Sequence, residues 1–97
     1  MNQFELVGRI LEEPVRSQTS TGIKVAKFKV CIDKIKEDDK TFEIYEIIVF
    51  RQLAELELVP GQYVSIVGKL SANNYEKENT TYYNVSLIGN AVNLLSN

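Results

Sequence analysis

The chain has 97 residues and a formal net charge of −2 at pH 7, and it contains one cysteine and no histidine. A chain of this length can bury one modest core, so residues 1–97 are expected to form a single domain. The lone Cys31 and the missing histidines exclude histidine-based acid–base catalysis, cysteine–histidine nucleophiles and most zinc sites. Catalysis by carboxylates or lysines stays open, but no constellation of base, nucleophile or metal ligands is visible in the sequence. We therefore expect a protein that is not an enzyme and that holds no metal or cofactor.

The sequence contains no feature that points to a membrane or to an oxidising compartment. No apolar run approaches the roughly 20 residues that span a bilayer, and residues 1–5 lack the basic flank and apolar core of a signal peptide. Cys31 has no partner for an internal disulfide, and its flanks Val30 and Ile32 favour a packed thiol. The sequence thus predicts a cytoplasmic protein without membrane contact.

Alternation of apolar and polar residues predicts five β-strands in chain order. The expected strands span residues 2–11, 23–35, 41–50, 62–70 and 82–88. Residues 51–56 favour a short helix of about two turns between the third and fourth strands. Turn-forming residues predict loops at 15–22, 36–40 and 71–81, and residues 90–95 are expected to form one helical turn.

Three strands, a short helix and two further strands make up the pattern of the OB-fold, an all-β architecture built as a five-stranded Greek-key barrel. A sandwich of the same strands is the alternative. Gly8 and Gly68 lie inside the first and fourth strands, where glycine marks a bend or a close backbone approach. These glycines favour the barrel, and we expect their role to be structural.

The second and third strands each have a face that either binds a ligand or belongs to the ordinary surface or core. Lys27 and Lys29 share one face of the second strand, and Phe28 is expected in the core. The two lysines are a solvated face, a guard on an edge strand or a patch for phosphates. Phe42 and Phe50 share one face of the third strand and are either core residues or a platform for bases.

A protein that binds single strands of nucleic acid combines cations for phosphates with aromatic rings for bases. The candidate cations are Arg9, Arg16, Lys24, Lys27, Lys29, Arg51 and Lys69. The candidate aromatic residues are Phe42, Tyr45, Phe50, Tyr75, Tyr82 and Tyr83. The acidic residues gather elsewhere in the sequence, at 12–13, 37–39 and 55–57, and this separation allows a basic groove on an acidic protein.

Several segments of the chain resemble, in the same order, segments of bacterial single-stranded DNA-binding proteins. They are residues 1–11 with Pro14 and Arg16, then 22–28, 47–55, 60–70 and 74–76, so the resemblance covers nearly the whole chain. The resemblance implies an oligomeric, cytoplasmic OB-fold protein that binds single-stranded DNA with little sequence preference. Such proteins protect and organise the DNA during replication, recombination and repair.

The resemblance also assigns roles to single positions. Phe50 falls where the family has an aromatic residue that stacks on bases, and Tyr75 falls where it often has a tryptophan or tyrosine. Ile44 replaces a stacking tryptophan of many members, and the region of Ile35 lacks an aromatic that some members have. Tyr75 also lies in a polar segment with little core to join, which favours a contact role.

Partners follow from the same resemblance. A dimer or tetramer is expected to form through the first strand, with Phe4, Leu6 and Val7 pairing across a two-fold axis. The chain stops at Asn97 without the long acidic-tipped tail common in the family, so we expect a short variant or a trimmed chain. The alternative function is an adaptor like primosomal replication protein N, which acts mainly through contacts with replication or primosome proteins.

Overall fold

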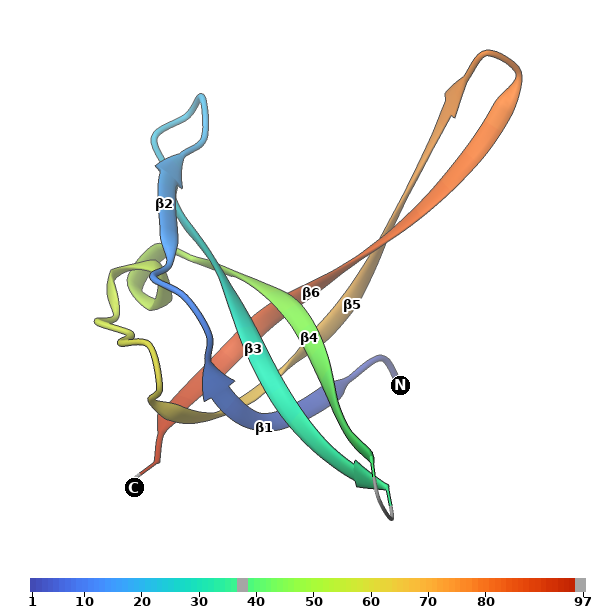
Figure 1. The fold of residues 1–97 in the computed structure, drawn as a ribbon. Helices are drawn as coiled ribbons and strands as arrows, with labels where there is room; N and C mark the ends of the chain where they lie inside the picture. Colours follow the sequence, from blue (N-terminus) through green and yellow to red (C-terminus); the bar gives the residue numbers. More distant parts are fainter. Residues whose placement is uncertain (37–38, 96–97) are drawn as a thin grey trace.

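The computed structural model describes the backbone of residues 1–36 and 39–95, and their side chains except at positions 34–36, 39, 40 and 83. Figure 1 shows a small barrel from which two hairpins project. The strands are β1 (Phe4–Ile10), β2 (Val15–Gln18), β3 (Lys24–Lys36), β4 (Asp39–Phe50), β5 (Tyr63–Lys77) and β6 (Thr80–Leu94), and a 3-10 turn, η1 (Arg51–Glu55), separates β4 from β5.

The strands form one sheet that closes on itself. Their order is β1-β5-β6-β4-β3-β2, and an additional pairing of Arg9 and Ile10 in β1 with Cys31 and Val30 in β3 completes the barrel. Strands β4 and β6 run parallel, while the other neighbours are antiparallel. A single sheet that closes on itself is a barrel, as expected for the OB-fold, and not the alternative sandwich of two sheets.

Strand alternation explains which side chains fill the barrel. Ala26, Phe28 and Val30 point inward from β3, and Ile47 and Val49 point inward from β4, all of them at most 2% exposed. The expected core position of Phe28 is therefore confirmed. Truncating a fully buried side chain such as Ile47 removes about 2–5 kcal/mol of stability, so this inner face is what holds the outer face in place.

Two glycines lie where two backbones approach each other closely. A Cβ atom at Gly68 would lie 1.9 Å from the carbonyl oxygen of Ile88, and one at Gly8 would lie 2.6 Å from that of Cys31. Gly68 also coincides with a shift in the register between β5 and β6, which is the signature of a β-bulge. Both glycines are structural, as the sequence indicated.

The largest departure from the sequence-based expectation is the length of the last two strands. Residues 71–81 and 90–95 were expected as a loop and a helical turn, but they belong to β5 and β6 apart from the turn at 78–79 and Leu95, which follows β6. The residues of this hairpin beyond the barrel are mostly polar, so their sequence shows no alternation of apolar and polar residues. The two strands are held together by backbone hydrogen bonds between them. We call residues 71–86, which extend the hairpin beyond the barrel, the arm (Figure 1).

Two smaller expectations are also corrected. Within the predicted loop at 15–22, strand β2 pairs with β3 from Val15 opposite Lys27 to Gln18 opposite Lys24. The predicted helix is a 3-10 turn of five residues, which begins at Arg51 with a positive φ of 60°. Of the predicted loop at 36–40, residues 37–38 lie outside the described residues, and β3 and β4 extend to either side of them.

Candidate nucleic-acid interface

The outward face of β3 and β4 collects several of the predicted site residues. Lys27 lies opposite Ile48, and Lys29 lies opposite Glu46. Phe50 is 37% exposed, and it shares its side of β4 with Ile48 because side chains alternate along a strand. The sequence left open whether Phe50 faces the core or the surface, and the fold directs it outward.

This face continues onto β6 and β5. Ile48 of β4 is paired with Ile88 of β6, and Ile88 is paired with Lys69 of β5. A row of side chains on the outer wall therefore runs from Lys27 across Ile48 and Ile88 to Lys69. Because β6 alternates, Tyr82 is on the same side of the strand as Ile88, so the outer side of the arm is an extension of the β3–β4 face.

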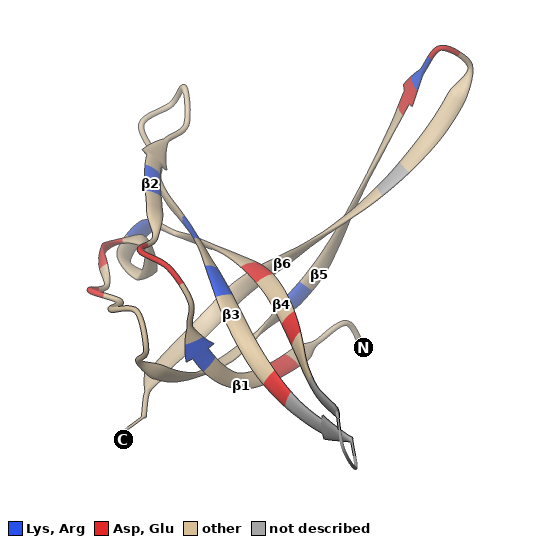
Figure 2. Cartoon of the chain, in the orientation of Figure 1, with Lys and Arg blue, Asp and Glu red and all other residues tan. Residues whose placement is uncertain are grey.

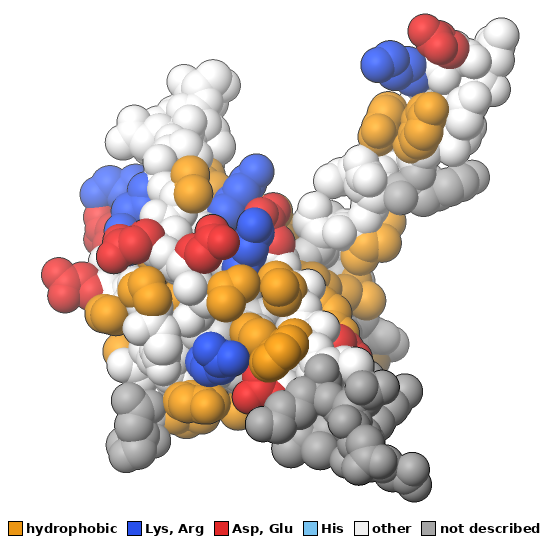
Figure 3. Space-filling model, in the orientation of Figure 1, with side chains coloured by type: hydrophobic (Ala, Val, Ile, Leu, Met, Phe, Trp, Pro, Cys, Tyr) orange, Lys and Arg blue, Asp and Glu red, His pale blue; other side chains and the backbone are white. Residues whose placement is uncertain are grey.

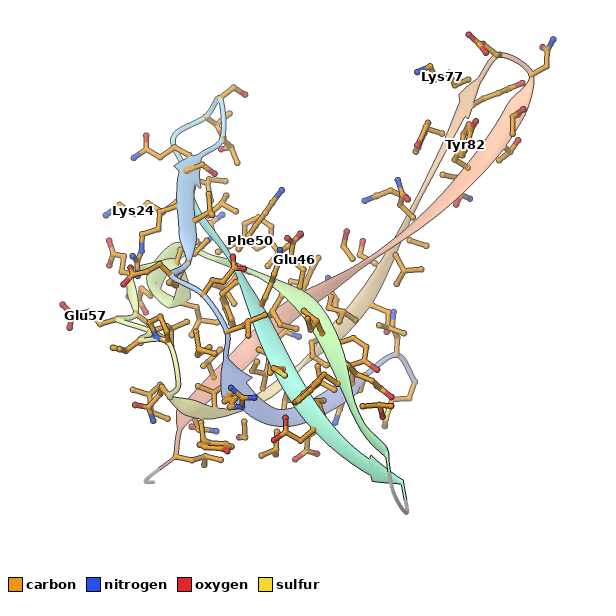
Figure 4. All side chains as sticks on the ribbon, in the orientation of Figure 1. Lys24, Glu46, Phe50, Glu57, Lys77 and Tyr82 are labelled. Carbon is orange, nitrogen blue, oxygen red and sulfur yellow. The ribbon has the colours of Figure 1, made fainter. Side chains whose placement is uncertain are left out.

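The arm carries a preformed aromatic platform. Tyr75 of β5 and Tyr82 of β6 are directly paired, and their rings stack with centroids 5.1 Å apart and an interplanar angle of 16°. The two residues are 48% and 43% exposed, so part of each ring remains accessible for a further stacking contact. Figure 4 shows Tyr82 high on the arm, well away from Phe50 on the barrel wall. The sequence placed Tyr75 in a loop, but the residue lies in a strand.

Two projections flank the face. The β2–β3 hairpin rises on one side and the arm on the other, with β3 and β4 between them (Figure 1). Figure 3 shows apolar side chains spread over the β3–β4 wall, with basic and acidic side chains above them. In OB-folds this strand face and the loops on either side of it are where oligonucleotides bind.

Two predicted cations turn away from this face and contact the η1 region. Arg16 donates from Nε to the carbonyl oxygen of Ala54 at 3.2 Å and from Nη2 to that of Leu56 at 2.5 Å. Lys24 forms an ion pair with Glu55. In Figure 4 Lys24 lies on the opposite side of the β2–β3 hairpin from Phe50. Arg16 and Lys24 also line a pocket of about 610 Å³ beside Ala54 and Glu55.

The remaining cations lie at the margins of the face. Arg9 on β1 forms an ion pair with Asp33 at 3.4 Å and donates to the Cys31 sulfur at 3.9 Å. Arg51 begins η1 directly after Phe50, and its positive φ is a conformation that non-glycine residues adopt only under constraint. Lys69 lies at the barrel end of the arm.

The expectation that acidic residues lie apart from the lysine face is wrong. Glu12, Glu13 and Glu46 line the same hollow of about 220 Å³ as Lys27 and Lys29. The connection between β1 and β2 is pinned there, since the Leu11 N–H donates to the Lys29 carbonyl oxygen at 2.9 Å. Figure 2 shows acidic bands on this connection and on β4 beside the basic bands of β3. Acidic residues that are separated from the lysines in the sequence thus lie beside them in the folded protein. Sequence reasoning did not identify Glu46 as part of this site, because its neighbours on β4 are apolar.

The far end of β4 is apolar and exposed. Phe42 and Ile44 are 58% and 54% exposed and lie opposite Asp33 and Cys31. Phe42 is therefore outward-facing like Phe50, but the Lys29–Glu46 pair separates the two phenylalanines. Cys31 itself is buried, as its flanks indicated.

The described side chains do not supply a metal site. No group of three or more histidine, cysteine, aspartate or glutamate residues among them is arranged to hold a metal ion. In the same part of the chain, no helix is long and apolar enough to cross a membrane.

Comparison with known proteins agrees with this geometry. Residues 1–95 match the model of the single-strand binding protein family. A single-stranded DNA-binding protein of Staphylococcus aureus is 28% identical over 102 residues, which cover 98% of this chain and 65% of that protein. One from Thermotoga maritima is 26% identical over 83 residues, which cover 77% of this chain and 59% of that protein. The chain thus spans about two thirds or less of the length of these relatives.

Solved structures share the fold. The chain from a Plasmodium falciparum SSB complex with ssDNA superimposes with a TM-score of 0.79 at 22% identity, covering 99% of this chain and 96% of that one. A deletion mutant of the single-stranded DNA binding protein from Thermus aquaticus gives a TM-score of 0.81 at 18% identity, covering 99% and 51%. The fold and the outer face define an OB-fold of the nucleic-acid-binding kind. The chain belongs to the single-strand binding protein family, a family of binding proteins and not of enzymes.

Proposed function

We propose that this protein binds single-stranded DNA with little sequence preference along the outer face of β3 and β4 and up the arm. The observation that carries the proposal is the continuity of that face. The pair of Ile48 with Ile88 links the lysine wall to the side of β6 that bears Tyr82, and Tyr82 stacks on Tyr75. The family match adds independent support.

The division of labour follows from the chemistry of each group. Bases stack on the exposed ring surfaces of Phe50 and of the tyrosine pair, where each contact contributes about 1–3 kcal/mol whatever the base. Phosphates interact with Lys27 and Lys29, which no described carboxylate holds in an ion pair. Neither the stacking contacts nor the phosphate contacts involve the hydrogen-bonding edges of the bases. Little sequence preference is therefore expected.

The proposal is tested by fluorescence polarisation with labelled oligo(dT) over a salt series. Wild-type protein should bind at low salt, and its affinity should fall steeply as salt rises. Tyr75→Ala should weaken binding by about 1–3 kcal/mol with little change in the salt dependence. Tyr63→Ala is the matched control, because Tyr63 is an exposed tyrosine at the other end of β5. Folded wild-type protein that fails to bind at low salt would refute the proposal.

We further propose that the protein is a homodimer or tetramer assembled through β1 and that it acts in the cytoplasm, in replication, recombination and repair. In the described residues, β1 pairs with β5 from Phe4 to Arg9 but with β3 only at Arg9 and Ile10. Most of its second edge is thus open to another strand. Joining copies would lengthen the path for DNA and raise the avidity.

Sedimentation equilibrium of an edge variant tests the assembly. Val7 is an exposed residue of β1, and a lysine on an edge strand opposes pairing with another strand. Val7→Lys should lower the mass toward that of a monomer and weaken oligo(dT) binding. Val59→Lys, an equally exposed site outside the strands, should change neither. An unchanged mass for Val7→Lys would contradict assembly through β1.

An adaptor role is the second candidate function. It is supported by Phe42 and Ile44, which expose apolar surface on β4, a feature typical of contact sites between proteins. Replication or primosome proteins retained by wild-type protein but lost with Ile44→Ser, while oligo(dT) affinity is unchanged, would favour this role. Retention of the same partners by both proteins would count against it.

A further inference from the structure

We propose that Glu46, with Glu12 and Glu13, competes intramolecularly with DNA phosphates for Lys27 and Lys29, so that Glu46 limits the affinity of this face for single strands. This inference rests on the proposed function and deepens it. It concerns a residue that neither the family match nor the sequence pattern singles out, and it assigns that residue an unfavourable role toward the ligand.

The arrangement of the hollow is the first step of the argument. Three acidic residues, Glu12, Glu13 and Glu46, line it together with two lysines, Lys27 and Lys29. Glu46 is the direct cross-strand neighbour of Lys29. The hollow therefore carries more negative than positive groups, on a face whose expected ligand is a polyanion.

The second step is that these charges are close but not locked together. The ion pairs among the described side chains are Arg9 with Asp33 and Lys24 with Glu55, so the carboxylates of the hollow hold neither Lys27 nor Lys29. Glu46, Lys27 and Lys29 are all exposed. Exposed carboxylates within a Debye length of the lysines reduce the positive potential that a phosphate meets, and they repel the phosphate themselves.

The third step distinguishes the two lysines. Lys27 lies between Val15 of β2 and Ile48 of β4, two residues without charge. Lys29 lies beside Glu46 and beside the connection that carries Glu12 and Glu13, which the Leu11–Lys29 hydrogen bond holds in place. Attraction of phosphate by Lys29 is thus offset more strongly in the wild-type protein than attraction by Lys27, which shares the hollow but has no charged cross-strand neighbour.

The test is a double-mutant cycle with oligo(dT) at about 50 mM salt. Glu46→Gln should tighten binding by about two- to fivefold, the range of exposed charge pairs. Glu57→Gln removes the same charge from a residue that Figure 4 places at the left edge of the molecule, well away from Glu46, and it should change affinity by less than that. Lys29→Ala should weaken binding by less than about twofold in the wild-type background but by about two- to fivefold in the Glu46→Gln background.

The outcomes separate this inference from the proposed function. Equal effects of Glu46→Gln and Glu57→Gln, or the same effect of Lys29→Ala in both backgrounds, would overturn the competition while leaving DNA binding intact. Wild-type protein that does not bind oligo(dT) would overturn the proposed function itself. As a second measurement, the gain from Glu46→Gln should disappear near 0.5 M salt, because screening removes a Coulomb effect. A gain that persists at that salt would contradict an electrostatic competition.

Discussion

The two sides of the β2–β3 hairpin use the same residue types for different purposes. On one side, Arg16 and Lys24 are turned toward η1, where carbonyl oxygens and Glu55 take up their donors. On the other side, Lys27 and Lys29 lie on the open wall beside Phe50. The difference teaches that a cation in a predicted binding segment contributes to DNA binding only where the fold leaves its donors available. The first pair supports the structure, and the second pair is the one we expect to contact phosphate.

Arg16→Ala should have the largest effect of the variants that separate the two pairs. It removes two charge-assisted hydrogen bonds to the carbonyl oxygens of Ala54 and Leu56, so the free energy of unfolding should fall by about 1–3 kcal/mol. Urea denaturation followed by circular dichroism measures this loss. The protein that remains folded should keep its salt dependence on oligo(dT). A salt slope lowered by about one, without loss of stability, would assign Arg16 to the DNA instead.

Lys27→Ala should show the opposite pattern. The lysine lies outward between Val15 and Ile48, so stability should change by no more than about 0.5 kcal/mol. The slope of log affinity against log salt should fall by about one unit, because one phosphate contact is lost. Polarisation over a salt series measures the slope. An unchanged slope would end the assignment of this wall as the phosphate-binding side.

Arg51 lies at the boundary between the two sides, and a glycine at this position should separate conformation from charge. Its φ of 60° is unfavourable for arginine and free for glycine. Arg51→Gly should therefore raise stability by about 0.5–1 kcal/mol, while Arg51→Ala, which keeps the Cβ atom, should leave it nearly unchanged. If Arg51 contacts phosphate, both variants should weaken binding equally. Two variants with wild-type affinity would leave Arg51 a structural position only.

Lys24→Ala should have the smallest effect. The side chains of Lys24 and Glu55 are 54% and 52% exposed, and such surface pairs contribute between zero and about 1 kcal/mol. Thermal unfolding should shift by a few degrees at most, and the salt slope on oligo(dT) should match that of wild type. A lower slope would show that the ion pair opens for DNA, and the contrast with Lys27 would then weaken.

The barrel could be predicted from the sequence because burial leaves a pattern. Ala26, Phe28 and Val30 alternate with lysines in the sequence and alternate inward in the structure. The arm could not be predicted, since its polar residues bury nothing and their pairing is visible only once β5 and β6 lie together. The expected helical turn at 90–95 was wrong for a different reason, since residues 91–94 pair with the distant residues 64–67 of β5, and Val92 packs against the core.

The candidate site was predictable in its parts but not in its arrangement. Lys27, Lys29, Phe50 and Tyr75 were identified by residue type and by resemblance. The outward direction of Phe50 was not predictable, because both faces of β4 are apolar in sequence. The contacts of Arg16 with η1 and the approach of Glu12, Glu13 and Glu46 to the lysines join distant segments, and no local pattern records them.

The bulge at Gly68 has a mechanical consequence for the tyrosine platform. Tyr75 lies roughly 24 Å along β5 from Gly68, at about 3.4 Å per residue. A small change in the direction of the hairpin at the bulge would therefore displace Tyr75 by a larger distance. Tilting the arm by about 10° would move the rings roughly 4 Å sideways, close to the rise of about 3.4 Å per nucleotide of a DNA strand. The close approach of Gly68 to the Ile88 carbonyl thus helps to set where the tyrosine platform lies relative to the barrel, and we expect a larger side chain at Gly68 to displace the platform.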